Sequence, residues 1–307
     1  MTITAVEAPA GWSRRPGARV FSGHESFACR YGWLPKLYEA VTDDPALFSS
    51  DERAILKLGL GRNMVKSIRF WGEAFGLTRQ SGGETRTTEF ADRLLHPEDG
   101  LDRYLETPGA LWRLHWTLAT HGGLGAWTVT FLDLHDQDIP RDRLLTAIMR
   151  KAEAVRGPIT AQTAGVHLDM LTRTYAAATD DDASADDILG SPFQELGLMR
   201  LVEPAGVRTV RLVRGAKPSI DLRAFAFVLH DFWNGTAATS RTLSMRTMML
   251  SHAAPGSTLL LDEAGLHDRL DALCAASASL TLRPDGAGGL DLTCAGDPLV
   301  EMERLAW

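Results

Sequence analysis

The 307-residue sequence lacks a hydrophobic run near the roughly eighteen apolar residues of a membrane-spanning helix. The first twenty residues lack the long apolar core and cleavage site of a signal peptide, and we expect residues 1–20 to form a mobile leader. Only three cysteines occur, Cys29, Cys274 and Cys294, and their spacing and number suit neither a metal site nor a disulfide framework. These absences predict a protein of the reducing cytoplasm that does not act in a membrane.

Charge is unevenly distributed along the chain. The net charge of −7 argues by itself against a nucleic-acid partner. Residues 53–86, however, contain seven Lys and Arg against two Asp and Glu, and residues 200–251 contain eight against three. Each basic zone lies near a predicted β-hairpin, which favours a role in binding phosphates over the alternative that the arginines only solvate helix faces.

Composition and periodicity predict the fold class. The hydrophobic share of 45% and the charged share of 23% are ordinary for a globular protein, and the length suits two or three small domains. We predict a mainly α protein with short β-hairpins (α+β), in which winged helix-turn-helix units are joined by a helical body. The expected domains are an N-terminal winged-helix DNA-binding domain (21–105), a helical middle domain with a basic hairpin (106–220) and a C-terminal winged-helix-like domain (221–307).

The first basic zone predicts a helix-turn-helix. Ser49 and Glu52 have the spacing of a capping box, so a helix should begin there and end at the glycine-rich turn 59–61. A second helix should run from about residue 62 to Phe75, with Gly76 as its C-terminal stop.

The second helix has opposite apolar and polar sides. At about 100° per residue, one stripe consists of Met64, Ile68, Trp71 and Phe75. The predicted DNA contacts lie on or beside the opposite stripe, and they are Arg62, Asn63, Lys66, Ser67 and Arg69. Arginine and lysine suit phosphates or guanine edges, and asparagine suits adenine edges.

A hairpin signal follows this helix. Two short strand-like pieces surround Gly82 and Gly83, and Arg79 and Arg86 flank the tip. A helix-turn-helix followed by a basic hairpin is typical of a winged helix, so both arginines are predicted to contact DNA. The alternative is a helical corner whose arginines face only water.

The rest of the chain predicts further helices and hairpins. Amphipathic or capped patterns predict helices within 107–121, 141–155 and 160–178, whereas residues 125–134 suit either a strand or a short buried helix. A second basic hairpin should turn near residues 204–206, with Arg208, Arg211 and Arg214 as further predicted DNA contacts. Near the C-terminus, two helices and a hairpin (280–294) suggest another winged-helix-like unit, and its acidic second helix suits a protein partner better than DNA.

The segment FSGHESFACRYGWLPK, residues 21–36, is rich in polar and aromatic side chains. One hypothesis is catalytic: His24 is a base or metal ligand, Glu25 a metal ligand and Arg30 a phosphate clamp, with Lys36 nearby. The alternative is architectural, with aromatic anchors and polar groups that satisfy the buried backbone. If the segment were a strand, His24 and Glu25 would point to opposite faces.

Four segments carry a family resemblance. They are residues 21–36, LGLGRNMVKSIRFWGEAFGL (58–77), RYLETPGALWRLHW (103–116) and SPFQELGLMR (191–200). Together they resemble a bacterial domain-of-unknown-function family that includes the SspB proteins of Ssp DNA phosphorothioation systems. The resemblance implies a DNA-nicking component of a phage-defence system. Its implied partners are a cysteine desulfurase, an ATP-pyrophosphatase-like enzyme and an ATPase, together with double-stranded DNA.

Three functions remain open at the level of sequence. The first is a nickase that cuts one DNA strand with Mg²⁺ or Mn²⁺, which the resemblance favours. The second is a non-catalytic, sequence-specific adaptor that recruits sulfur-transfer enzymes. The absence of the paired acidic residues and lysine of common restriction-type nucleases favours the adaptor. The third is a winged-helix transcription regulator, which the length and the extra helical body make a weaker interpretation.

Overall fold

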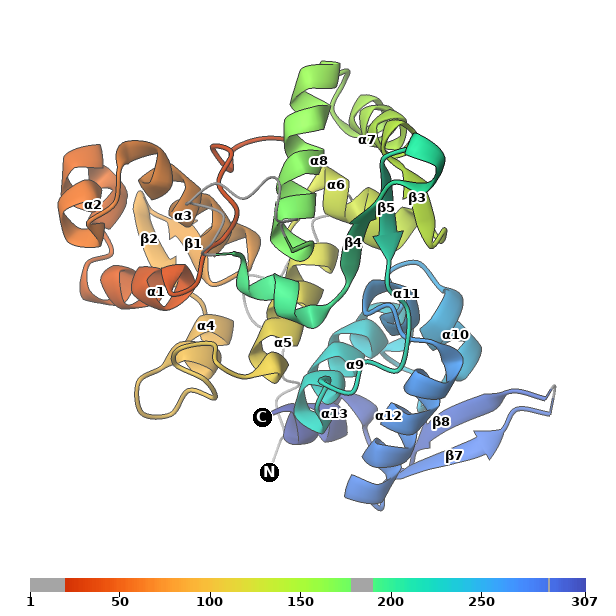
Figure 1. The fold of residues 1–307 in the computed structure, drawn as a ribbon. Helices are drawn as coiled ribbons and strands as arrows, with labels where there is room; N and C mark the ends of the chain where they lie inside the picture. Colours follow the sequence, from red (N-terminus) through yellow and green to blue (C-terminus); the bar gives the residue numbers. More distant parts are fainter. Residues whose placement is uncertain (1–19, 178–189, 287) are drawn as a thin grey trace.

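The computed structural model describes residues 20–177, 190–286 and 288–307; the predicted leader therefore lies outside the described residues, except for Val20. Helices dominate, and the strands form three small antiparallel sheets (Figure 1). The mainly α fold with short hairpins is thus confirmed. None of the helices in the described ranges has both the length and the hydropathy of a membrane span.

The first unit contains the predicted helix-turn-helix and hairpin. Its elements are α1 (Trp33–Asp43), the 3₁₀ turn η1 (Leu47–Ser49), α2 (Asp51–Leu58), α3 (Arg62–Ala74), β1 (Thr78–Ser81), β2 (Glu84–Thr87) and α4 (Glu89–Leu95). The cap of α2 is Ser50, whose Oγ accepts from Arg53 N at 3.2 Å, because Ser49 lies in the preceding 3₁₀ turn. Gly59 ends α2 with a φ of 60°, a conformation that glycine adopts without strain.

The second unit begins with α5 (Pro108–Thr120), α6 (Gly125–Trp127) and the π-helical turn η2 (Thr128–Asp133). Residues 125–133 are therefore helical, and the strand alternative is wrong. Residues 125–132 are all buried, so this stretch has no polar face that would reveal a helical period. The unit continues with β3 (Asp138–Pro140), α7 (Arg141–Val155), α8 (Ala161–Tyr175), η3 (Pro192–Leu196), β4 (Met199–Val202), η4 (Pro204–Gly206) and β5 (Thr209–Leu212).

The third unit contains α9 (Leu222–Ala237), β6 (Thr242–Ser244), α10 (Met245–Leu250), α11 (Pro255–Thr258), α12 (Glu263–Ala276), β7 (Leu280–Pro284), β8 (Leu290–Cys294) and α13 (Pro298–Ala306). Its sheet order, β6-β8-β7, matches the order β3-β5-β4 of the second unit. In both units a short strand, β3 or β6, is followed by further helices and then by the hairpin, and the last strand of the hairpin occupies the centre of the sheet. The first unit has the same succession of helices and hairpin, with η1 in the place of the first strand.

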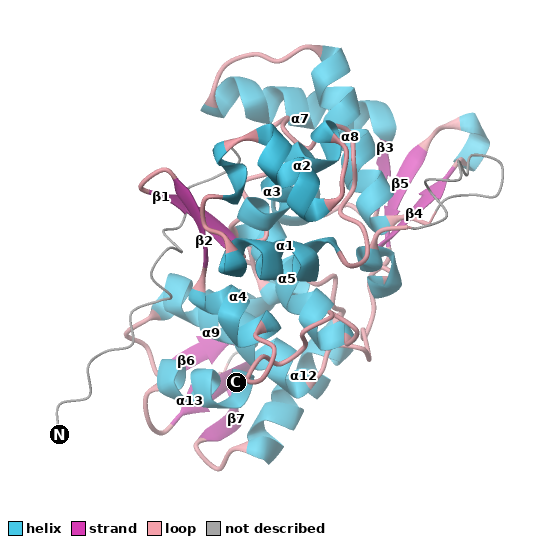
Figure 2. Cartoon of the chain, turned by 90° about the vertical axis from the view of Figure 1, so that its left-hand side faces the viewer, coloured by secondary structure: helices cyan, strands magenta, loops and turns pink. Residues whose placement is uncertain are grey.

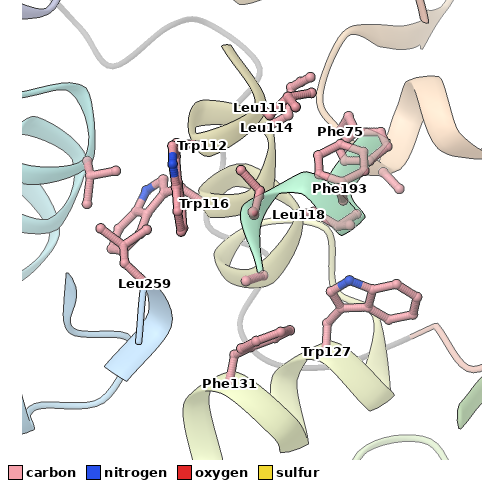
Figure 3. Packing of buried hydrophobic residues seen from close by; sticks show 14 of the residues in the cluster. Phe75, Leu111, Trp112, Leu114, Trp116, Leu118, Trp127, Phe131, Phe193 and Leu259 are labelled. Atoms are coloured by element: carbon pink, nitrogen blue, oxygen red, sulfur yellow. The ribbon is translucent and has the colours of Figure 1, made fainter. Parts of the chain in front are cut away.

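Helix α5 lies at the centre of the molecule. All residues from Gly109 to Ala119 are buried, as expected for a helix that contacts other elements on every side (Figure 3). Phe75 at the end of α3 stacks on Phe193 of η3, with ring centroids 5.0 Å apart, so the first two units share one core. A Cβ atom on Gly125 would lie 2.0 Å from the Phe21 ring, which explains why the chain has no side chain there.

The two basic hairpins lie apart. Figure 2 shows β1–β2 at one edge of the molecule and β4–β5 at the opposite edge. Any surface built on one hairpin is therefore separate from a surface built on the other.

Candidate nucleic-acid interface

Helix α3 presents the predicted polar stripe to solvent. Arg62, Asn63 and Lys66 are exposed, whereas Ile68 and Trp71 on the opposite side are completely buried. Trp71 also donates its indole N–H to Phe27 O at 2.9 Å, which fixes the rotation of the helix about its axis. The orientation predicted from periodicity is thus confirmed.

Ser67 does not belong to the exposed face, which corrects the sequence-based prediction. Its side chain is fully buried, and its Oγ donates to Phe27 O at 3.3 Å. Helical geometry placed Ser67 between the two stripes. The chain around Phe27 packs on this side of α3, so the intermediate position becomes an interior one.

Several arginines of this face are ion-paired. Arg62 lies 3.3 Å from Asp51, Arg69 lies 3.5 Å from Glu73, and Arg86 lies 2.6 Å from Glu84. All these side chains are at least 40% exposed, so each pair contributes little to stability and can exchange for a phosphate. Within the described ranges, Lys66 and Arg79 have no ion-pair partner.

The β1–β2 hairpin lies beside α3. Arg79 and Arg86 are direct partners in its register, and Gly82 and Gly83 form the turn with φ of 61° and 85°. Gln80 donates to Glu73 of α3 at 3.0 Å and thereby ties the strand to the helix. The structure therefore brings the α3 face and the first hairpin together.

The predicted arginines of the second hairpin lie in different surroundings. Arg208 is exposed near the tip, and Arg211 forms two bonds to the Asp138 carboxylate, at 2.6 and 2.9 Å. Arg214 lies beyond β5 and donates from Nη1 to Gly256 O and Leu261 O, both at 2.8 Å. The β4–β5 hairpin lies at the opposite edge of the molecule from the β1–β2 hairpin (Figure 2).

Residues 23–26, with the sequence GHES, form a tight turn and not a strand; they are called the GHES turn below. Phe27 N donates to His24 O at 3.0 Å, and Glu25 and Ser26 adopt φ of 47° and 61°. Two left-handed residues in succession characterise a type I′ turn, which normally contains glycine or asparagine. Glu25 and Ser26 are exposed at its tip, while His24 is only 2% exposed.

His24 forms a hydrogen bond with His167, which is 143 residues away in the sequence. Ser26 N donates to His24 Nδ1 at 3.3 Å, so the neutral ring carries its proton on Nε2 and donates to His167 Nδ1 of α8, also at 3.3 Å. Neutral His167 then carries its proton on Nε2, which has no hydrogen-bond partner in the described ranges. Burial lowers the pKa of His24 to about 4 and that of His167 to about 3, and the neighbouring His24 also lowers the pKa of His167.

The catalytic hypothesis for His24, Glu25 and Arg30 gains no support from this geometry. His24 is enclosed between α3 and α8, whereas Glu25 faces solvent. The Arg30 guanidinium lies over the rings of Phe27 and Trp33, at 5.6 and 5.7 Å. The architectural alternative agrees with the burial of His24 and Phe21.

The described residues offer no ready-made metal site. Among them, no three His, Cys, Asp or Glu side chains converge as metal ligands would. Magnesium prefers carboxylate oxygens and water, and Glu25 is an isolated carboxylate on the GHES turn.

Sequence reasoning missed His167. It lies on the buried side of an amphipathic helix. The neighbouring sequence does not indicate whether such a histidine forms a hydrogen bond to another element or only packs in the core. Only the close approach of α8 to the GHES turn reveals its role.

Comparisons with known proteins agree on one relationship. Two crystal structures of SspB, one with a bound magnesium ion, each match with a TM-score of 0.83 and 29% sequence identity, covering 94% of this chain and 87% of the SspB chain. The comparison with curated proteins gives no significant match. The profile of the family of proteins of unknown function DUF4007 matches residues 21–305. The chain therefore belongs to the DUF4007 family, as the resemblance of its four segments had indicated.

Proposed function

We propose that this protein is the DNA-binding, strand-nicking component of an Ssp-type DNA phosphorothioation system. In this proposal α2, α3 and the β1–β2 hairpin form a winged helix that contacts double-stranded DNA. The observation that carries the proposal is the exposed face of Arg62, Asn63 and Lys66, which is opposed to a fully buried apolar face. The similarity to SspB over nearly the whole chain supports it.

The shape of this unit suits a DNA duplex. The three-residue turn between α2 and α3 leaves the N-terminal part of α3 accessible, which is the part that enters the major groove in helix-turn-helix proteins. Asn63 lies in the first turn of α3, where its amide can pair with an adenine edge, while Lys66 and Arg79 are available for phosphates.

Strand nicking is the more specific part of the proposal. The SspB structure with magnesium favours it, together with a requirement for Mg²⁺ or Mn²⁺. The enclosed position of His24 favours the alternative, an adaptor that binds DNA and recruits partners without chemistry of its own. In either case we expect the partners to be a cysteine desulfurase, an ATP-pyrophosphatase-like enzyme and an ATPase.

Duplex binding by the double variant Arg62→Ala/Lys66→Ala tests the DNA interface. We expect weaker binding at moderate salt and a salt slope reduced by roughly two units, because about one counterion is released for each phosphate contact. The matched control is Arg283→Ala/Arg304→Ala, which removes two exposed positive charges from the third unit. If both double variants bind as tightly as the wild type, α3 is not the DNA-contacting helix.

Supercoiled plasmid separates the nickase from the adaptor. Conversion to open circles by the purified protein with Mg²⁺ or Mn²⁺ supports nicking. A gel shift without conversion supports the adaptor, or the transcription regulator if no sulfur-transfer enzyme associates with the protein.

A further inference from the structure

Helix α4 of the first unit lies against the third unit (Figure 2). Phe90 of α4 stacks on Phe227 of α9, with ring centroids 5.4 Å apart. Trp307, the residue after α13, meets both rings edge-on, at 6.3 Å from Phe90 and 5.8 Å from Phe227. Three segments that are distant in the sequence therefore share one aromatic cluster, which joins α4 to α9 and α13.

Two arginines approach the Trp307 ring from different units. The Arg93 guanidinium of α4 lies over the ring, 4.1 Å from its centroid, and forms an ion pair with Glu303 of α13. The Arg113 guanidinium of α5 lies over the same ring at 5.4 Å and donates from Nη2 to Ala306 O at 2.9 Å. The side chains of Arg93 and Glu303 are 30% and 26% exposed, so solvent screens their attraction only in part. Arg93 is thus bound to the third unit by two contacts, one with an aromatic ring and one with a carboxylate.

The other side of α4 is fixed to the proposed DNA-binding elements. Thr88, which follows β2, accepts from Ala91 N at 3.2 Å as the cap of α4. Its Oγ1 also donates to Gly76 O, just after α3, at 2.6 Å. Asp92 of α4 accepts from the Tyr38 hydroxyl of α1 at 3.0 Å. Helix α4 is therefore held to α1, to the end of α3 and to the β1–β2 hairpin, and a displacement of these elements should move it.

We propose that the contact of α4 with α9, α13 and Trp307, called the α4–α13 joint below, couples the α3 face to the third unit. The residues of the joint are Phe90, Arg93, Phe227, Glu303 and Trp307. A duplex that restrains α3 and the first hairpin also restrains α4, and through the joint it stabilises α13. The coupling is reciprocal, because a partner that binds the third unit and stabilises α13 must strengthen duplex binding by the same factor. The role of the duplex rests on the proposed function, whereas the joint itself does not.

Hydrogen exchange of the full-length protein without DNA tests the joint. We expect Arg93→Gln to accelerate amide exchange in both α4 and α13 by about tenfold, because it removes the ion pair and the cation–π contact. Exchange in α7, which lies in the second unit, should not change. The matched control is Arg304→Gln, which removes an equal charge from α13 and breaks the pair with Glu301 of the same helix. It should leave exchange in α4 unchanged.

A second variant tests the aromatic part of the joint. Trp307→Leu keeps an apolar side chain but removes the ring that Arg93 covers, and it should accelerate exchange in α4 as Arg93→Gln does. Unchanged exchange in α4 for both variants would overturn the joint. Equal acceleration in α7 would overturn it as well, since the two residues would then contribute only to global stability.

A saturating DNA duplex tests the coupling. It should slow exchange in α13 of the wild type and of Arg304→Gln, but not of Arg93→Gln. If the duplex slows exchange in α3 but not in α13 of the wild type, the coupling is overturned while the proposed DNA binding stands. If the wild type does not bind the duplex at all, the proposed function fails, and the exchange of the free variants alone decides whether the joint exists.

Discussion

His24 shows how the surroundings of one residue determine its role. Its sequence context suggested a catalytic base, but the ring lies between Phe70 of α3 and His167 of α8. It also accepts the Ser26 N–H and so stabilises the strained turn. A buried neutral imidazole with a pKa of about 4 is a poor base for a phosphodiester at the surface.

Replacing His24 with alanine tests this role. We expect the free energy of unfolding to fall by about 1–3 kcal/mol, because the Ser26 N–H and His167 Nδ1 both lose their partner in the interior. Urea unfolding measures this difference. Glu25→Ala is the matched control, since its side chain is exposed and its loss should change stability by no more than about 0.5 kcal/mol.

A different result for His24→Ala would support a catalytic role for His24. A His24→Ala variant that unfolds like the wild type and binds DNA, yet no longer nicks a plasmid that the wild type nicks, would show that His24 acts in the reaction.

Helix α3 contributes both to the hydrophobic core and to the proposed DNA contact. Its buried side carries Trp71, which contacts Phe70, Phe75 and Trp127 edge-on or at a tilt. Its exposed side carries Arg62 and Lys66. Because the two sides share one rigid helix, the burial of Trp71 determines the direction in which the cations point.

Trp71→Ala should therefore be strongly destabilising. We expect a loss of about 3–5 kcal/mol in the free energy of unfolding, since a fully buried indole leaves a large cavity. Chemical denaturation followed by circular dichroism measures it, with Lys66→Ala as the control on the exposed side of the same helix. An unchanged melting temperature for Trp71→Ala would mean that α3 is rotated from the orientation described above.

At the scale of the whole molecule, α5 connects the second and third units through a buried polar network. His115 of α5 donates from Nε2 to Thr258 O of α11 at 2.9 Å, and its Nδ1 accepts from the Tyr175 hydroxyl of α8 at 2.8 Å. The Trp127 indole donates to the same hydroxyl at 3.2 Å. Burial lowers the pKa of His115 to about 4, so the network contains a neutral histidine.

The three buried histidines make stability depend on pH. In the unfolded chain His24, His115 and His167 should titrate near pH 6.5, whereas in the folded protein their pKa values are about 4, 4 and 3. Their full contribution is therefore present above pH 6.5. It is lost as pH falls from 6.5 toward 4, because only the unfolded state takes up protons in that window.

Urea unfolding at pH 7.5 and pH 5 measures this loss. Linkage predicts that it amounts to ~2 kcal/mol per histidine at pH 5. Equal stability at the two pH values would contradict the assignment of neutral, buried histidines.

Much of the fold was predictable because its signals are local. The predicted boundaries of α7 agree with the structure, and those of α3 differ from it by one residue, since periodicity and capping depend on neighbouring residues alone. The hairpins were located by glycine and proline at their turns, where backbone conformation is restricted. The sequence indicated recurrent units of helices and a hairpin, but it did not indicate the three-residue strands β3 and β6, which are too short to show a periodicity and pair with a strand that is distant in the sequence.

The sequence by itself determined which side of α3 is apolar, that a glycine ends α2, and which family the chain belongs to. The tertiary structure alone decided that Ser67 and His24 are interior and that Asp138 neutralises Arg211. The physical reason is the distance in sequence over which each property is set. Helix and strand periodicity follow from a few adjacent residues. Burial and charge compensation depend instead on residues that are distant in the sequence, such as His167, which lies 143 residues from its partner His24.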